Sequence, residues 1–328
     1  MKLTYAQALV RAIRDALVAN PKVFLIGSGF VALSTNGRAA FAPLFQEFSD
    51  RVVAAPVSEL GIAGAGTGAA LSGCRPLVDL GAGSFTFQAW AQVVNEAPNI
   101  HYMTGEQASV PVTWYALVGI RGSGAAQHSH RVQSMLGNVP GLQILLPATP
   151  SDAYQMLKWA MLESNNPTAF LTHSLLLDEE EEIDFARLAP AIGRARVARP
   201  GKDATIVAYS VTVGRALAAA ELLATRHGIS AEVIDMRSLC PLDRETMISS
   251  VIRTGRAVIA DECHLRFGVG AELAAVLAEE AFAGLDAPVR RVATPDAPIP
   301  YSPVLESALV VTPEKIAQGV LAVCNYKA

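Results

Sequence analysis

The chain has 328 residues, of which 51% are hydrophobic and 17% are charged. This composition is typical of folded globular domains and excludes a mainly disordered protein, and the length indicates two domains instead of one core. The formal net charge is -4 and the lysines and arginines form no cluster, so neither nucleic acid nor an anionic membrane surface is expected as a partner.

Cysteine usage and hydropathy predict a cytoplasmic protein. The cysteines are far apart and form no Cys-x-x-Cys pair, which argues against a disulfide scaffold or a cysteine-based zinc site and fits a reducing compartment. Arg11, Arg14 and Asp15 interrupt the apolar face of the first twenty residues, so no secretory signal is expected. Prolines break the uncharged stretch 132–151, so no membrane span is expected there.

In the first half of the chain, short β-rich runs alternate with helical patterns, which is typical of α/β units around a mainly parallel sheet. Thr4 is a predicted N-cap, and Ala8, Leu9, Ile13 and Leu17 form one apolar helix face after it. Further helices are predicted over 58–72, 85–97 and 151–163. Strands are predicted over 23–26, 52–55, 76–80, 110–116, 142–147 and 168–173.

A second α/β module follows a less regular stretch. The acidic run 178–182 opens a predicted linker over 178–200, with a first domain over 1–177 and a second over 201–328. We interpret the acidic run as a solvated connector and not as a binding site. Strands are predicted over 204–210, 231–236, 257–262 and 289–294, and helices over 212–226, 243–254, 270–282 and 313–323.

Two nucleotide-binding motifs can be tested directly. The sequence has no Gly-x-x-x-x-Gly-Lys-Ser/Thr phosphate loop. The run Gly64-Ala-Gly66-Thr-Gly68-Ala69 satisfies a loose dinucleotide pattern, but it lies inside a predicted helix and not at a strand-to-helix turn, so it is not a credible NAD site. A helix with so many small residues has two interpretations. It packs tightly on the sheet, or a second subunit approaches it closely.

Glu59 and His128 are candidate functional residues, and each also has a purely structural reading. Ser58 is a good N-cap and Glu59 would favour the dipole of the helix that follows, yet a carboxylate at the carboxyl end of a parallel strand also lies where α/β proteins bind ligands. His128 lies in a glycine-rich loop after a strand, where a side chain can face a ligand. A metal at His128 and His130 would need a further ligand that the sequence does not offer.

The order of several motifs resembles the beta subunit of the thiamine-diphosphate-dependent 2-oxo acid dehydrogenases, the family that includes the first components for pyruvate, branched-chain 2-oxo acids and acetoin. The resemblance covers nearly the whole chain. The matching segments are Ala55–Gly64, Phe85 with Gln88, Gln92–Asn95, Tyr102–Gly105, Ala126–Ser129, Pro140–Leu142, Ser151–Ala153, Asn166–Pro167, Val233–Leu239, Gly268–Glu272, Leu285–Pro288 and Pro298–Tyr301.

This resemblance implies a pyrimidine-binding α/β domain followed by a transketolase-type C-terminal α/β domain. It also implies thiamine diphosphate with Mg²⁺ as cofactor, a small 2-oxo acid as substrate and an alpha subunit as partner, usually in an α2β2 assembly. The family's Gly-Asp-Gly motif for Mg²⁺ and diphosphate is absent from this sequence, so the resemblance assigns those groups to the alpha subunit. A lipoyl-bearing acyltransferase core is a further expected partner.

The resemblance also assigns roles to individual residues. Glu59 aligns with the glutamate that hydrogen-bonds N1′ of the cofactor's aminopyrimidine ring, and Phe85 resembles the aromatic residue that packs on that ring. His128 matches the active-site histidine on the thiazolium side, which assists proton transfer or orients the acyl intermediate. Gln88 and Ser28 are expected at the cofactor as well.

A structural potassium site, ligated mostly by carbonyl oxygens, is implied at four positions of this family. They are Val112, Ala160, Glu163 and Asn165. Hard oxygen ligands suit such a cation, although Glu163 stands where aspartate is common in the family.

Three departures from the family pattern keep other functions open. Gly27-Ser28 replaces a Gly-Glu pair, Gly81–Ser84 replaces an aromatic-rich stretch, and Ala91 replaces an aspartate. The expected function is a 2-oxo acid dehydrogenase that decarboxylates its substrate and acylates lipoamide. The alternatives are a carboligase that passes the intermediate to a carbonyl acceptor, and a catalytically silent structural subunit.

Overall fold

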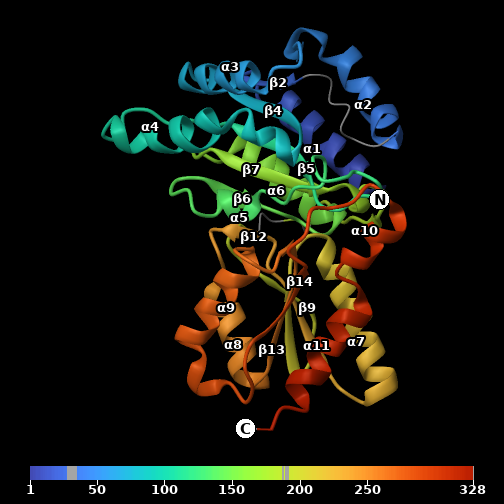
Figure 1. The fold of residues 1–328 in the computed structure, drawn as a ribbon. Helices are drawn as coiled ribbons and strands as arrows, with labels where there is room; N and C mark the ends of the chain where they lie inside the picture. The colour runs from blue at the N-terminus through green and yellow to red at the C-terminus, as the bar shows by residue number, and fades with distance from the viewer. Residues whose placement is uncertain (28–34, 187, 189–191, 328) are drawn as a thin grey trace. The chain divides into compact units, whose positions relative to one another are not determined.

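The computed structural model describes residues 1–27, 35–186, 188 and 192–327, and it divides into two compact units. The N-terminal unit comprises Met1–Arg121 and Gln127–Ile192, and the C-terminal unit comprises Gly122–Ala126 and Gly193–Ala328. Figure 1 shows the N-terminal unit in blue to yellow-green and most of the C-terminal unit in yellow to red.

The sheet of the N-terminal unit is built from parallel strands in the order β6-β7-β5-β4-β2-β3. The predicted strands are confirmed, with shifts of a few residues at their ends. β7 and β5 are buried along their whole length, as expected for central strands of a parallel sheet. The bounds are β2 Val23–Gly27, β3 Val52–Ala54, β4 Arg75–Ala82, β5 Thr113–Val118, β6 Gln143–Leu145 and β7 Thr168–His173.

Helix α1 (Tyr5–Ala19) forms as its capping residues predict. The Thr4 side chain accepts a hydrogen bond from the Gln7 amide, and the Gln7 side chain accepts one from the Thr4 amide, which closes a capping box. Its apolar face is buried, and the helix packs against α6 (Pro150–Leu162) and α2 (Thr35–Glu47). Other helical segments here are η1 Ser49–Arg51, α3 Glu59–Leu71, α5 Gln133–Leu136 and η4 Ser174–Leu176.

The segment predicted as one helix over 85–97 has three different geometries. A 3-10 helix, η2, spans Gly83–Phe87, a π-helix, η3, spans Ala91–Glu96, and α4 spans Ala97–Met103. In the π-helix, the Ala97 amide donates to the Gln92 carbonyl five residues back. Apolar periodicity alone does not distinguish these helix types, because 3-10, π and α turns differ mainly in which carbonyl each amide reaches.

The stretch treated as a linker over 178–200 contains two strands. β8 (Glu180–Glu182) pairs antiparallel with β1 (Lys2–Thr4), and β9 (Arg196–Arg199) joins the sheet of the C-terminal unit. The acidic run is thus partly bound: Lys2 forms an ion pair with Glu180, and the Glu181 carboxylate accepts hydrogen bonds from the amide (2.8 Å) and hydroxyl (2.6 Å) of Ser151. These contacts depend on a partner strand that lies far away in the sequence.

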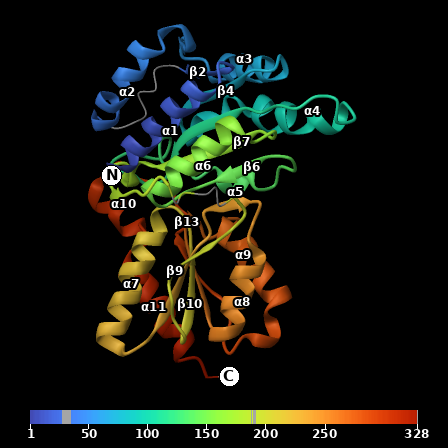
Figure 2. The ribbon, with the colours of Figure 1, turned by 180° about the vertical axis from the view of Figure 1, so that it is seen from behind.

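The C-terminal unit has a five-stranded sheet in the order β14-β13-β10-β11-β9, parallel except for β9. Its strands are β10 Ala204–Ala208, β11 Ala231–Asp235, β13 Ala257–His264 and β14 Arg290–Thr294, and a short strand, β12, spans Ser238–Cys240. Helices α7 (Val211–His227) and α11 (Pro313–Cys324) lie on one side of this sheet, and α8 (Arg244–Thr254) and α9 (Val269–Glu280) on the other (Figures 1 and 2).

Of the two helices nearest the C-terminus, one agrees with the sequence prediction and one does not. α10 (Pro303–Leu309) was not predicted, whereas α11 confirms the prediction over 313–323, and η5 spans Phe282–Gly284. The stretch 303–324 is long and apolar enough to cross a membrane by length and composition. In the structure, however, α10 and α11 are separate helices, and α11 packs against α7, β13 and β14 through buried Ile316, Val320 and Val323.

Candidate active site

The candidate site residues follow parallel strands of one sheet in the N-terminal unit. His128 follows β5, Phe85 follows β4, and Glu59 follows β3, within the strand order β5-β4-β2-β3. The chain leaves β2 toward β3 on one side and leaves β4 toward β5 on the other, so β2 and β4 form a topological switch point. Ligands of open α/β sheets bind outside the carboxyl ends of the strands at such a point, which makes this edge of the sheet the candidate active site.

Glu59 is the first residue of α3. The hydroxyl oxygen of Ser58 accepts a hydrogen bond from the Gly61 amide at 3.3 Å, which confirms Ser58 as the N-cap. The Glu59 side chain is partly exposed, and within the described part of the chain no side chain or amide is hydrogen-bonded to its carboxylate. Its neighbours Val57 and Leu60 are 78% and 53% exposed. In the part of the chain that the structure describes, the carboxylate is therefore available to a ligand, beside exposed apolar side chains.

Phe85 lies in η2, directly after β4, and its ring rests on the backbone of Gly81. A Cβ atom added to Gly81 would lie 3.3 Å from Cδ2 of Phe85. Gly81 has a φ of +72°, a conformation in which glycine is favoured, and its amide donates a 2.8 Å hydrogen bond to buried Asp79. The short residues of 81–84 thus bring this ring close to the main chain of the turn.

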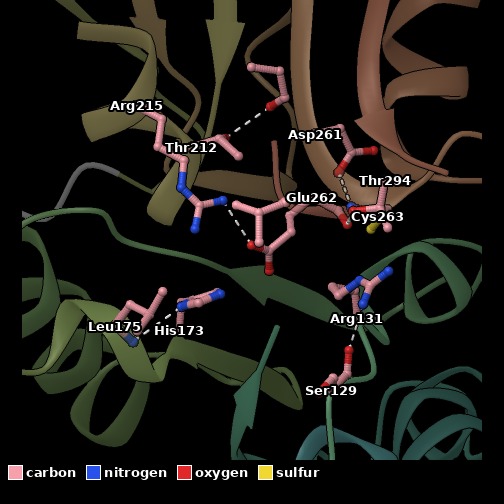
Figure 3. A network of polar contacts seen from close by, with 12 residues as sticks. Ser129, Arg131, His173, Leu175, Thr212, Arg215, Asp261, Glu262, Cys263 and Thr294 are labelled. Carbon is pink, nitrogen blue, oxygen red and sulfur yellow. Dashed lines mark hydrogen bonds and ion pairs between the residues drawn. The ribbon is translucent and has the colours of Figure 1, made fainter. Parts of the chain in front are cut away.

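His128 meets Phe85 directly. The two ring centroids are 5.5 Å apart and the ring planes are inclined by 83°, an edge-to-face arrangement. After His128, the backbone is held by two hydrogen bonds: the Gly119 amide donates to the His130 carbonyl at 3.2 Å, and the Arg131 guanidinium donates to the Ser129 carbonyl at 2.7 Å (Figure 3). The fold therefore brings together two of the residues that the sequence singles out.

Gln88 and Ser28 are the other two residues predicted to bind the cofactor. Gln88 caps the end of η2, its amide donates to the Phe85 carbonyl at 3.0 Å, and its side chain is exposed. Ser28 lies outside the described residues, so the structure says nothing of its role.

Two residues that the sequence analysis passed over also belong to this edge of the sheet. Asp79 is buried in β4 and holds Gly81, and His173 ends β7, where its Nδ1 accepts a hydrogen bond from the Leu175 amide at 3.2 Å (Figure 3). The signal for each is that it is the one ionisable residue of its predicted strand, 76–80 or 168–173, since a buried carboxylate or imidazole needs a partner.

Of the expected potassium ligands, Ala160, Glu163 and Asn165 lie at the C-terminus of α6, and Val112 lies just before β5. The amide of Ser164 donates to the Trp159 carbonyl at 3.2 Å, and not to the Ala160 carbonyl four residues back. The Val112 carbonyl accepts the Thr168 amide at 2.9 Å and retains one lone pair.

Arg75 lies at this same helix end. Its guanidinium donates to the Met161 and Ser164 carbonyls, which are different oxygens from those expected to bind the cation. Burial lowers the pKa of this guanidinium below its ordinary value, and the nearby Glu163 carboxylate offsets part of that shift.

The glycine-rich helix α3 has two different faces. A Cβ atom on Gly66 would lie 2.5 Å from Cγ2 of Val78 in β4, whereas Cβ atoms on Gly64 and Gly68 would meet nothing within 4 Å. Gly66 therefore serves tight packing against the sheet. Within the described part of the chain, Cβ atoms at Gly64 and Gly68 point into open space, so this face of α3 leaves room for the second interpretation, close approach of another subunit.

The C-terminal unit has its own buried polar network. Asp261 in β13, 1% exposed, accepts hydrogen bonds from the Tyr209 hydroxyl, the Cys263 amide at 2.8 Å and the Gly270 amide at 2.7 Å. Arg215 of α7 pairs with Glu262 at 2.9 Å (Figure 3). These bonds satisfy buried charges and tie helices α7 and α9 to strand β13.

Comparison with known proteins gives consistent matches along the chain. The family model of the transketolase pyrimidine-binding domain matches residues 1–179, and that of the transketolase C-terminal domain matches residues 193–316. The chain is 36% identical to the mitochondrial pyruvate dehydrogenase E1 component subunit beta of Dictyostelium discoideum, over 97% of this chain and 90% of that protein.

Two further relatives support the same relationship. The chain is 35% identical to the acetoin:2,6-dichlorophenolindophenol oxidoreductase subunit beta of Cupriavidus necator, over 96% of each chain. A solved structure described as a split gene transketolase, inactive beta4 tetramer, superposes with a TM-score of 0.80 at 25% identity and 99% coverage of both chains. With both domains matched in order and full-length relatives above one-third identity, the chain belongs to the beta subunits of the thiamine-diphosphate-dependent 2-oxo acid dehydrogenases.

Proposed function

We propose that this beta subunit, together with an alpha subunit, decarboxylates a small 2-oxo acid and transfers the acyl group to lipoamide. The observation that carries the proposal is the placement of Glu59, Phe85 and His128 after three parallel strands of one sheet, β3, β4 and β5, with Phe85 and His128 in ring contact. The sequence relationship to pyruvate and acetoin enzymes supports the reaction class.

The described residues fit the pyrimidine half of thiamine diphosphate. The Glu59 carboxylate has no partner in the described part of the chain and can accept a hydrogen bond from a ring nitrogen. A charge-assisted bond of this kind is about twice as strong as a neutral one. Phe85 offers an aromatic ring for packing, and the cofactor supplies the electron sink for decarboxylation.

His128 is the second residue of this chain to which we assign a role in the reaction. An imidazole can hold or release a proton near neutral pH, and His128 is only partly buried. We assign it to proton transfer at the substrate, or to orienting the acyl group for the incoming lipoyl arm. Mg²⁺ and the diphosphate belong, in this proposal, to the alpha subunit, because this sequence lacks the Gly-Asp-Gly motif.

The uncovered face of α3 supports the partner assignment. Leu60 and Leu71 are 53% and 45% exposed, and Gly64 and Gly68 leave open space between them. An apolar surface of this kind marks a contact site in soluble proteins. We propose that the alpha subunit covers it in an α2β2 assembly and that a lipoyl-bearing acyltransferase core binds the assembled enzyme.

Cellular location is a further part of the proposal. We place the enzyme in the cytoplasm, because Cys74, Cys240, Cys263 and Cys324 are all free thiols in the structure.

We further propose that a potassium ion binds at the C-terminus of α6. The Ala160 carbonyl supports this site, because the Ser164 amide donates to the Trp159 carbonyl instead. We expect KCl to raise the melting temperature by about 2 to 5 °C over NaCl or choline chloride at equal ionic strength. Differential scanning calorimetry of the full chain measures this. Because the proposed ligands are main-chain carbonyls, Asn165→Ala should keep the effect. Equal melting temperatures in all three salts would contradict the site.

Reconstitution tests the function itself. The chain is mixed with an alpha subunit that carries the Gly-Asp-Gly motif, thiamine diphosphate, Mg²⁺ and a panel of 2-oxo acids, and release of CO₂ and acylation of a lipoyl domain are followed. Both products are expected. CO₂ release with acyloin formation and no lipoyl acylation would favour the carboligase, and no CO₂ release from any 2-oxo acid would favour the silent subunit.

A further inference from the structure

Two phenylalanine–histidine pairs lie side by side next to the candidate site. Phe85 meets His128 at 5.5 Å and 83°, and Phe87 meets His130 at 5.2 Å and 81°. Both pairs are spaced by two residues on each segment, so η2 and the segment 128–130 run alongside one another with matching contacts. Only the first pair includes residues that the proposed function uses.

The Phe85 ring is also confined by the turn that carries it. Gly81 lies against the ring, and the bond from its amide to Asp79 holds the left-handed turn in place. Gly83 is equally close to its surroundings: a Cβ atom there would lie 2.9 Å from Cγ1 of Val118 and 3.3 Å from the His130 carbonyl oxygen. The turn that carries Phe85 is therefore pressed against the strand and loop that carry His128.

The main chain next to His128 is also fixed. The His130 carbonyl is bound by the Gly119 amide, and the Ser129 carbonyl by buried Arg131. With its backbone held in this way, His128 keeps freedom mainly in its side-chain torsions. The Phe85 ring restricts those torsions, because an imidazole that rotated away would lose the edge-to-face contact.

We infer that Phe85 is a positioning residue for His128: it selects the imidazole orientation that the reaction requires, in addition to any packing on the cofactor. This inference rests on the proposed function for its catalytic meaning. An edge-to-face pair of this kind corresponds to an expected two- to tenfold effect, about the range that aromatic pairs contribute.

Selective labelling of the full chain tests the contact without any turnover. Diethylpyrocarbonate modifies exposed imidazole nitrogens, and the tryptic peptide 122–131 contains both His128 and His130, whose fragment ions separate the two sites. Phe85→Leu should raise the labelling rate of His128 about two- to tenfold and leave His130 unchanged. Phe87→Leu is the matched control and should do the reverse. Phe85→Tyr, which keeps the ring, should restore the slow labelling of His128.

A double-mutant cycle on the reconstituted enzyme separates positioning from packing. If Phe85 acts through His128, Phe85→Leu lowers kcat about two- to tenfold in the wild-type background and has little further effect in His128→Ala. If Phe85 only packs on the cofactor, the two effects multiply, and the Michaelis constant for thiamine diphosphate rises equally in both backgrounds. Phe87→Leu should leave turnover unchanged.

The two possible failures can be told apart. A His128 labelling rate in Phe85→Leu that equals the wild-type rate overturns the positioning role, even in an active enzyme. Fully multiplicative effects in the double-mutant cycle overturn it as well. A wild-type complex with no turnover overturns the proposed function, and the labelling experiment then still decides whether Phe85 restrains His128.

Discussion

Replacing Glu59 by glutamine should lower kcat of the reconstituted enzyme by about 10²- to 10⁴-fold, the range expected for loss of an acid–base group. Glutamine keeps the size of the side chain but can neither carry the negative charge nor accept a charge-assisted hydrogen bond at both oxygens. Since the carboxylate has no partner in the described part of the chain, the change should shift the free energy of unfolding by less than about 0.5 kcal/mol.

The matched control for this variant is Glu245→Gln. Glu245 also lies in the first turn of its helix, α8, after a side-chain N-cap, so both variants lose the same interaction with a helix dipole. Steady-state decarboxylation with an artificial electron acceptor and urea unfolding of each chain give the two readouts. Wild-type turnover in Glu59→Gln, or an equal loss in Glu245→Gln, would show that Glu59 does not act on the cofactor.

Leucine at Gly64 or Gly68 should prevent assembly with the alpha subunit without unfolding the chain. A Cβ atom at either position meets nothing within 4 Å in the described part of the chain, and a leucine side chain would project into the surface that we assign to the partner. Alanine at either position should stabilise the isolated chain by about 0.5 to 1 kcal/mol, because glycine disfavours the interior of a helix.

Gly66→Ala should behave in the opposite way. Its Cβ would lie 2.5 Å from Cγ2 of Val78, so we expect a loss of about 1 to 3 kcal/mol from overpacking. Urea unfolding measures the three alanine variants, and analytical ultracentrifugation with the alpha subunit measures assembly of the leucine variants. Leucine variants that assemble and turn over like the wild type would rule out this face of α3 as the subunit contact.

Several features of the protein could be read from the sequence because they depend on neighbouring residues. The Thr4 capping box, the apolar face of α1 and the N-cap at Ser58 arise from side chains within one or two helical turns. The strands β5 and β7, buried along their whole length, coincide with predicted runs rich in aromatic and β-branched residues. Glu59 and His128 stand out for the same kind of reason, since each lies in the segment that connects a predicted strand to the next element.

Other features depend on which distant segments meet, and only the tertiary structure decided them. The sheet places the segments with Phe85 and His128, which follow β4 and β5, against each other, and it gives the two faces of α3 different surroundings. In a separate sheet, β8 pairs with β1 within the stretch predicted as a linker. The physical reason is the range of the interactions. Periodicity and capping act over a few residues of chain, whereas strand pairing and ring contacts form only after the sheet has chosen the neighbours of each strand.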